Sequence, residues 1–89
     1  MVLKIYSIFD KKTVVYGRPF FAHNSGHVIR TVQDELDPTK SQMARYPGDF
    51  AIYEIGTYDD SNGSLEPCEP KCVTELSELI IKEDIKCPN

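Results

Sequence analysis

The sequence predicts a small α+β domain, in which a three- to four-stranded, mainly antiparallel sheet has one helix packed on one face. Two strand-like runs, residues 2–9 and 50–58, share an Ile-Tyr-x-Ile core, and one amphipathic helical stretch lies between them. In residues 2–9, apolar side chains occur at both odd and even positions, which point to opposite faces of a strand. This pattern is typical of a central strand. A chain of 89 residues is short enough to form a single domain. We therefore expect both long strands near the middle of one sheet.

A polar turn and a short return strand are expected after the first strand. Residues 10–13 are polar, and residues 14–16 can form the return strand, which Gly17 and Pro19 end. The first strand would then have a hairpin partner on one side.

The helix is predicted from both its start signal and its periodicity. Asn24 or Ser25 is a candidate N-cap, because its side-chain oxygen can accept a hydrogen bond from a free amide of the first turn. Apolar residues then recur at helical spacing until Pro38, and proline pushes the preceding residue out of helical geometry. The pattern predicts a helix over residues 25–36, packed over two isoleucines, Ile5 and Ile52.

The second half reads as a connector, a corner and a long strand. Residues 39–45 are polar and fit at most one helical turn, residues 46–49 form the corner, and the strand follows at residues 50–58. Gly56 inside that strand is typical of a bulge or of a close approach by another backbone.

A hairpin and a C-terminal extension complete the expected fold. Residues 59–63 predict the hairpin turn, with Gly63 supplying a positive φ. The return strand at residues 65–68 is expected at a sheet edge, because Pro67 and Pro70 lack the amide that a sheet ladder needs. The chain then divides into an α+β core at residues 1–67 and an extension at residues 68–89. The segment of residues 73–85 favours a short helix, although residues 79–81 would equally suit a strand.

The charge of the chain is unevenly distributed. The formal net charge is −4. Residues 1–45 hold seven basic and four acidic side chains, a balance of +3, whereas residues 46–89 hold three basic and ten acidic ones, a balance of −7. An acidic chain disfavours strong non-specific DNA binding, which needs clustered basic side chains. A local basic patch on the N-terminal half remains compatible with the sequence, formed by Lys4, Lys11, Lys12, Arg18 and Arg30.

No catalytic, cofactor or metal site is predicted. The three cysteines, Cys68, Cys72 and Cys87, lack the spacing of a common zinc knuckle, and an odd count disfavours a disulfide framework. His23 and His27 are four residues apart but have no Glu-x-x-His context. The acidic pair Asp59 and Asp60 suits turn formation better than cation binding. We therefore expect a non-enzymatic protein without cofactor or metal.

An uncovered sheet face gives two possible modes of binding. With one helix on one face, the other face would expose aromatic side chains, which can stack on unpaired bases or form a self-complementary dimer contact. Apolar open faces on small domains more often mark protein interfaces, which favours the homodimer. The expected interface residues are Tyr6, Ile8, Tyr53 and Ile55.

Three motifs in order resemble one viral family. The motifs are Lys4-Ile5-Tyr6-Ser7-Ile8-Phe9-Asp10, then Pro19-Phe20-Phe21, then the run from Tyr46 to Gly63, which reads YPGDFAIYEIGTYDDSNG. Together they resemble the small nonstructural protein of gokushoviruses, which are single-stranded DNA phages of the Microviridae. The resemblance covers residues 4–67, and it does not extend to the C-terminal tail.

The resemblance implies an accessory protein that acts in single-stranded DNA synthesis or genome packaging, in contact with phage replication or procapsid proteins. Two alternatives stay open: a sequence-tolerant single-stranded DNA-binding protein, and a homodimeric protein-interaction module that targets a host factor. No apolar run is long enough to span a bilayer, and the N-terminus lacks a signal-peptide core, so we expect the host cytoplasm and no membrane partner.

Overall fold

The structure, a computed structural model, contains a five-stranded antiparallel sheet and describes residues 1–36, 39 and 41–79. Its strand order is β2-β1-β4-β5, with β3 also paired to β1. The strands are β1 (Val2–Asp10), β2 (Val15–Tyr16), β3 (Phe20–Ala22), β4 (Phe50–Asp59) and β5 (Ser64–Glu75). The two long runs of the sequence thus become the neighbouring central strands β1 and β4, as predicted.

Strands β1 and β4 pair along their whole length. The register runs from Val2 opposite Asp59 to Asp10 opposite Phe50. It shifts by one residue between Ile5 and Tyr6, where Ile55 of β4 is the extra residue. A bulge of this kind bends the strand and increases its local twist.

Strands β2 and β3 lie end to end along the free edge of β1. The amide of Gly17 donates to the carbonyl of Ile8 at 2.8 Å, and the hydroxyl of Ser7 donates to the carbonyl of Gly17 at 2.8 Å. These bonds hold the connection between the two strands against β1. The expected return strand is present as β2. Residues 20–22 were expected only to connect to the helix, but they form the additional strand β3. The turn before β2 holds Val14 at a φ of 58°, a conformation that is unfavourable for a β-branched side chain.

The main helix, α1 (Ser25–Asp34), begins at the predicted cap. The Asn24 side chain accepts a hydrogen bond from the amide of His27 at 2.9 Å. The helix ends two residues earlier than predicted, and Pro38 lies outside the described residues. The polar connector does contain one helical turn, α2 (Gln42–Arg45), followed by the 3-10 turn η1 (Pro47–Asp49).

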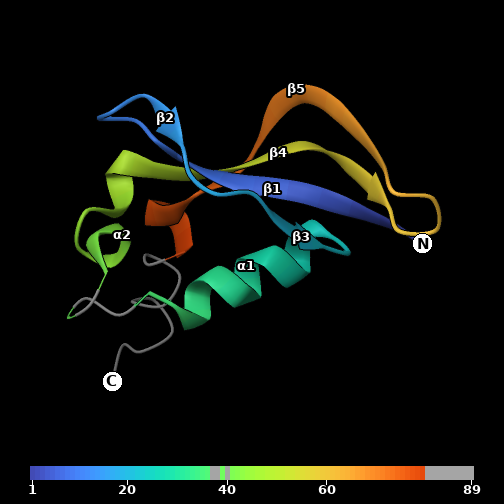
Figure 1. Cartoon of the computed structure of the whole chain (residues 1–89). Helices are drawn as coiled ribbons and strands as arrows, with labels where there is room; N and C mark the ends of the chain where they lie inside the picture. Colours follow the sequence, from blue (N-terminus) through green and yellow to red (C-terminus); the bar gives the residue numbers. More distant parts are fainter. Residues whose placement is uncertain (37–38, 40, 80–89) are drawn as a thin grey trace.

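One face of the sheet carries the core. Figure 1 shows α1 and α2 on the same side of the sheet, below the strands as drawn. The buried cluster contains side chains from the strands and from α1. Residues 76–79 are also helical and add two leucines to the cluster. The cluster consists of Tyr6, Ala22, Val28, Val32, Ile52, Leu76 and Leu79. Several short helical segments therefore cover this face, where a single helix was expected.

The residues beneath α1 differ in part from the prediction. Ile52 belongs to the core cluster, as expected, but Ile5 does not. Because Tyr6 belongs to the cluster and neighbouring strand residues point to opposite faces, Ile5 points to the uncovered face. The prediction failed because both the odd- and the even-numbered residues of β1 include apolar side chains. The pattern therefore does not identify the side that faces the helix.

The β4–β5 hairpin has the predicted turn and a longer return strand. The amide of Gly63 donates to the carbonyl of Asp59 at 2.8 Å, and Gly63 has a φ of 75°. A Cβ at Gly56 would lie 2.6 Å from the carbonyl oxygen of Glu66, so the predicted close approach of another backbone is present. Strand β5 is an edge strand, as its prolines, Pro67 and Pro70, indicated.

The C-terminal part of the prediction needs two corrections. Residues 73–75 are the end of β5 and not the start of a helix, while residues 80–85 of that predicted helix lie outside the described residues. Strand β5 also crosses the boundary placed after residue 67 without a break, and Leu76 and Leu79 are buried in the core. The described part beyond residue 67 is thus an integral part of the sheet and core, and not an appended segment.

Candidate functional site: an uncovered sheet face and an edge groove

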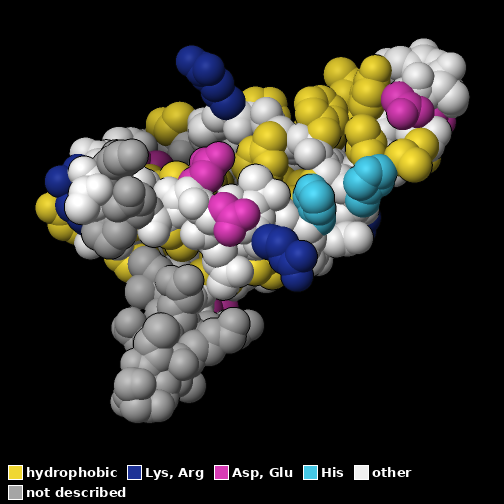
Figure 2. Space-filling view, turned by 90° about the horizontal axis from the view of Figure 1, so that it is seen from below, with side chains coloured by type: hydrophobic (Ala, Val, Ile, Leu, Met, Phe, Trp, Pro, Cys, Tyr) yellow, Lys and Arg dark blue, Asp and Glu magenta, His cyan; other side chains and the backbone are white. Residues whose placement is uncertain are grey.

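The predicted basic residues do not form one patch. Lys4 and Lys11 are seven residues apart on or just after β1, which separates their backbones by ~23 Å in an extended strand. This spacing exceeds the ~8 Å screening length at physiological salt. Lys12 lies in the turn before β2, Arg18 between β2 and β3, and Arg30 on α1. Figure 2 shows the helix side, where basic side chains stand apart and acidic ones lie between them.

Two of the five basic side chains are already in ion pairs. The ammonium of Lys4 lies 3.7 Å from the carboxylate of Glu54, and Lys11 is hydrogen-bonded to Glu75 at the end of β5. The hydrogen bond that Lys11 donates to Glu75 raises the pKa of Lys11. These pairs reduce the positive charge that the N-terminal half presents to a polyanion.

The four expected interface residues do not share one exposed face. Tyr6 is 0% exposed and lies in the core, and Ile8 packs against the core cluster. Burial raises the pKa of Tyr6, and the neighbouring Glu54 adds to the shift. Ile55 is the extra residue of the β4 bulge. Tyr53 pairs opposite Ser7 and so lies on the uncovered face, as predicted.

The uncovered face carries two groups of aromatic side chains. Near the β1–β2 turn, Phe9, Tyr16 and Tyr53 form a mutual cluster, with ring centroids 4.6 Å apart for Phe9–Tyr16 and 5.7 Å apart for Phe9–Tyr53. Toward the β4–β5 hairpin, the rings of Phe21 and Tyr58 lie 5.4 Å apart. These separations are in the range of favourable ring contacts.

Part of this face is open to solvent. Tyr16 is 41% exposed and Phe21 49%, while Leu65, which pairs opposite Tyr58, is 62% exposed. Exposed apolar groups that gather on one side of a small domain are typical of a contact surface.

A thiol next to Tyr53 has no sign of activation. Cys72 pairs opposite Tyr53 in β5. Desolvation raises the pKa of Cys72, and Glu75 adds to the shift. Desolvation likewise raises the pKa of Tyr53, with Cys72 as the next cause. A raised thiol pKa disfavours the reactive thiolate.

No group of three or more potential metal ligands occurs among the described residues, and Cys87 lies outside them. Within residues 1–36, 39 and 41–79, no helix is long and apolar enough to cross a membrane.

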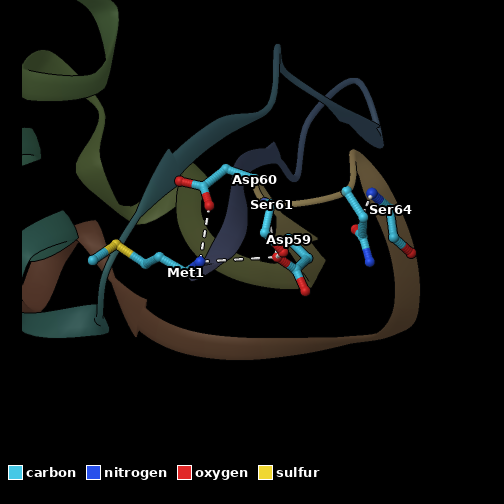
Figure 3. A network of polar contacts seen from close by, with 6 residues as sticks. Met1, Asp59, Asp60, Ser61 and Ser64 are labelled. Carbon is cyan, nitrogen blue, oxygen red and sulfur yellow. Dashed lines mark hydrogen bonds and ion pairs between the residues drawn. The ribbon is translucent and has the colours of Figure 1, made fainter.

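The acidic hairpin turn is engaged in local contacts. Figure 3 shows the terminal amine of Met1 directed at this turn, 2.9 Å from Asp60 and 3.9 Å from Asp59. The hydroxyl of Ser61 donates to Asp59 at 2.6 Å, and this bond, together with the Ser61 amide, lowers the pKa of Asp59. The turn therefore has the structural role that the sequence favoured over cation binding.

A groove between α1 and the free sheet edge was not anticipated from the sequence. Its volume is about 780 Å³. One wall is the continuous segment of residues 15–22, which includes β2 and β3, and the other is α1. Ile8, Met43 and Phe50, which are part-buried, form its apolar floor. We refer to this feature as the edge groove.

Charged and polar side chains border the edge groove. His27, Thr31 and Glu35 follow each other at one-turn spacing along the helix wall, a length of ~12 Å between the first and the last. Arg18 borders the opposite wall. The described residues offer no ion pair or hydrogen bond to the Arg18 guanidinium, which is therefore available to a partner.

Two sequence signals could have revealed the groove. The run from Gly17 to Pro19 breaks an edge strand without ending it, and the four-residue repeat of His27, Thr31 and Glu35 marks a helix line beside the buried valines. Neither signal gives the distance between strand edge and helix, which tertiary packing sets.

Comparison with known families assigns the chain to a phage family. Residues 3–79 match the model of the family described as Phage ORF5 protein, and the chain therefore belongs to this family. The match reaches Leu79, beyond the end of the resemblance at residue 67, in agreement with the burial of Leu76 and Leu79. Searches of curated proteins and of solved structures give no significant match.

Proposed function

We propose that this phage protein is a non-enzymatic accessory protein of a gokushovirus in the Microviridae, acting in single-stranded DNA synthesis or genome packaging. It would work in the host cytoplasm as a homodimer that contacts phage replication or procapsid proteins. The family match supports the phage origin. The more specific role comes from the resemblance of the three sequence motifs.

One observation favours protein contacts over DNA contacts. Three exposed apolar side chains, Tyr16, Phe21 and Leu65, lie on the uncovered sheet face beside the aromatic clusters, whereas the basic residues are dispersed and two of them are paired with carboxylates. Non-specific affinity for nucleic acid depends on several phosphates being neutralised together. Exposed aromatic groups, by contrast, supply contact area to a protein partner at small cost in side-chain entropy.

A second candidate function is direct binding of single-stranded DNA. The cluster of Phe9, Tyr16 and Tyr53 favours it, because aromatic rings on an open sheet can stack with bases of any sequence. Such binding would need cations nearby, and Lys11, a cation that acts electrostatically on Tyr53, is paired with Glu75.

Affinity capture and DNA titration test these functions together. The tagged full-length chain is expected to retain a phage replication or procapsid protein from infected cells, and sedimentation should give a mass above one chain. Binding to single-stranded oligonucleotides should be weak and should fall steeply with salt. Tight DNA binding at physiological salt, with no phage protein retained, would contradict the proposal and establish the second candidate.

A further inference from the structure

We propose that the edge groove binds an extended, apolar segment of a partner protein, which adds a strand to the outer side of β2 and β3. The segment would place an acidic side chain beside Arg18. This inference rests on the proposed function, in which the protein acts through protein contacts, and it names the surface and the chemistry of the partner.

The backbone of the groove wall supports strand addition. Within the part of the chain that the structure describes, β2 and β3 pair only with β1, so their outer amides and carbonyls face no other strand. An added strand would satisfy these groups, and main-chain hydrogen bonds of this kind give affinity without sequence requirements. The edge is short and interrupted, since Pro19 has no amide and the Gly17 amide donates to Ile8. Strand pairing alone would therefore be weak, and the groove must supply additional contacts.

The apolar floor of the groove supplies those contacts. The helix wall from His27 to Glu35 measures ~12 Å, which corresponds to about four residues of an extended chain. Alternate side chains of such a chain point to the same face, so about two would enter the groove. A volume of about 780 Å³ accommodates two large apolar side chains with space remaining. The part-buried side chains of Ile8, Met43 and Phe50 would contact them.

The charges that border the groove restrict the composition of the segment. Arg18 is an exposed cation without an ion-pair partner among the described residues, and it borders the groove beside β3. Glu35 lies at the C-terminal end of α1, the opposite end of the helix wall from His27. An acidic residue near Arg18 and a basic or neutral residue near Glu35 would complement both positions.

A second copy of the chain is a poor occupant of this groove. Its other sheet edge is β5, where Pro67 and Pro70 remove two amides. The register of β5 against β4 also shifts between Glu54 and Gly56, so that edge is irregular. A different protein with a regular, apolar strand fits the groove better.

The test uses the full-length chain and synthetic peptides. Overlapping peptides tiled over all other proteins of the same phage are screened for binding, and hits are measured by isothermal calorimetry. We expect at least one apolar peptide with an acidic residue to bind and to protect from hydrogen exchange those amides of residues 15–16 and 20–22 that point away from β1. N-methylation of the peptide amides that face the edge should abolish binding, because it removes the ladder donors.

A charge reversal with a matched control tests the role of Arg18. Arg18→Glu should weaken binding about tenfold, since an ion pair becomes a repulsion. Arg30→Glu makes the same change in charge on α1, away from the groove lining, and should change affinity less than about twofold. A peptide in which the acidic residue is replaced by lysine should recover affinity for the Arg18→Glu variant.

Several outcomes would overturn the inference. If an intact phage protein is retained by the chain but no tiled peptide binds, the groove is not the contact and the proposed function still holds. If no phage protein is retained at all, the proposed function itself fails. Peptide binding that is insensitive to both N-methylation and Arg18→Glu would place the contact elsewhere. Concentration-dependent protection of residues 15–22 without peptide, with a doubled mass, would identify a second copy as the occupant.

Discussion

Replacing Gly56 by alanine should destabilise the sheet, because the backbone of β5 occupies the space that a Cβ needs. The added Cβ would lie 2.6 Å from the carbonyl oxygen of Glu66 and 3.2 Å from the Cα of Pro67. Ordinary van der Waals contact begins at 3.4 Å, so β5 must move away by 3.4 − 2.6 = 0.8 Å at this point. The obstructing atoms all belong to the backbone of Glu66 and Pro67, so no flexible side chain can give way.

The expected cost follows from the bonds that such a movement stretches. A displacement of this size weakens the two neighbouring ladder hydrogen bonds, each worth about 1 kcal/mol. Alanine regains part of this loss, because glycine in a strand is unfavourable by roughly 0.5–1 kcal/mol. The net destabilisation should be about 1–1.5 kcal/mol, which lowers the Tm of a domain this size by roughly 4–12 °C.

Thermal unfolding followed by circular dichroism measures the effect, with Gly48→Ala as the matched control. A Cβ at Gly48 meets no atom within 4 Å, so this variant should unfold within a few degrees of the parent. If Gly56→Ala were as stable as the parent while Gly48→Ala behaved as expected, the close approach of β5 to β4 would be refuted.

Four further perturbations test other parts of the fold. Asn24→Ala removes the cap of α1 and should cost about 1 kcal/mol in urea unfolding. Leu76→Ala should cost about 2–5 kcal/mol in the same assay, and no loss would show that the chain beyond β5 is not packed in the core. Val14→Asn should stabilise the protein by about 1 kcal/mol, since asparagine tolerates a positive φ. The lowered pKa of Asp59 stabilises the folded state above pH 3.8, and this contribution is lost as the pH falls through the folded pKa. Ser61→Ala should raise that pKa in an NMR titration of the carboxyl group, and an unchanged value would exclude the hydroxyl as the cause.

Local signals predicted those elements whose geometry depends on neighbouring residues. The Asn24 cap, the positive φ of Gly63 and the edge position of the proline-containing strand each follow from the chemistry of one or two residues, and the structure contains all three. The close contact at Gly56 was also indicated, because glycine weakens the interior of a strand and often occurs there where another backbone comes close.

The sequence did not show which face of β1 packs against the helices. Tyr6 and Ile5 are both apolar enough for a core, and only the packing of Val28 and Val32 against the sheet decides that Tyr6 is buried there. The end of the chain was misjudged for a related reason. Residues 73–75 can form either a strand or a helix, and the pairing of β5 with β4 decides in favour of the strand.

The candidate site was predicted less well than the fold, because it depends on elements far apart in the sequence. Tyr53 was placed correctly on the uncovered face, but its partners Phe9 and Tyr16 come from β1 and β2. The basic residues were grouped by their nearness in the sequence, and an extended strand separates Lys4 from Lys11. Counting charges along the sequence therefore overestimates how closely they cluster in space when the charged residues lie on an extended strand.

The long register of β1 against β4 has a consequence for how the protein is made. Val2 pairs with Asp59, so the start of β1 pairs with a residue that is synthesised 59 − 2 = 57 residues later. Until then a strand that is apolar on both faces has no sheet to join, and only the short β2 and β3 can cover one of its edges. Leu76 and Leu79 complete the core later still. The core is therefore complete only after residue 79 has been made, and a chain terminated before β4 would leave β1 without its long partner strand, exposed to aggregation and proteolysis.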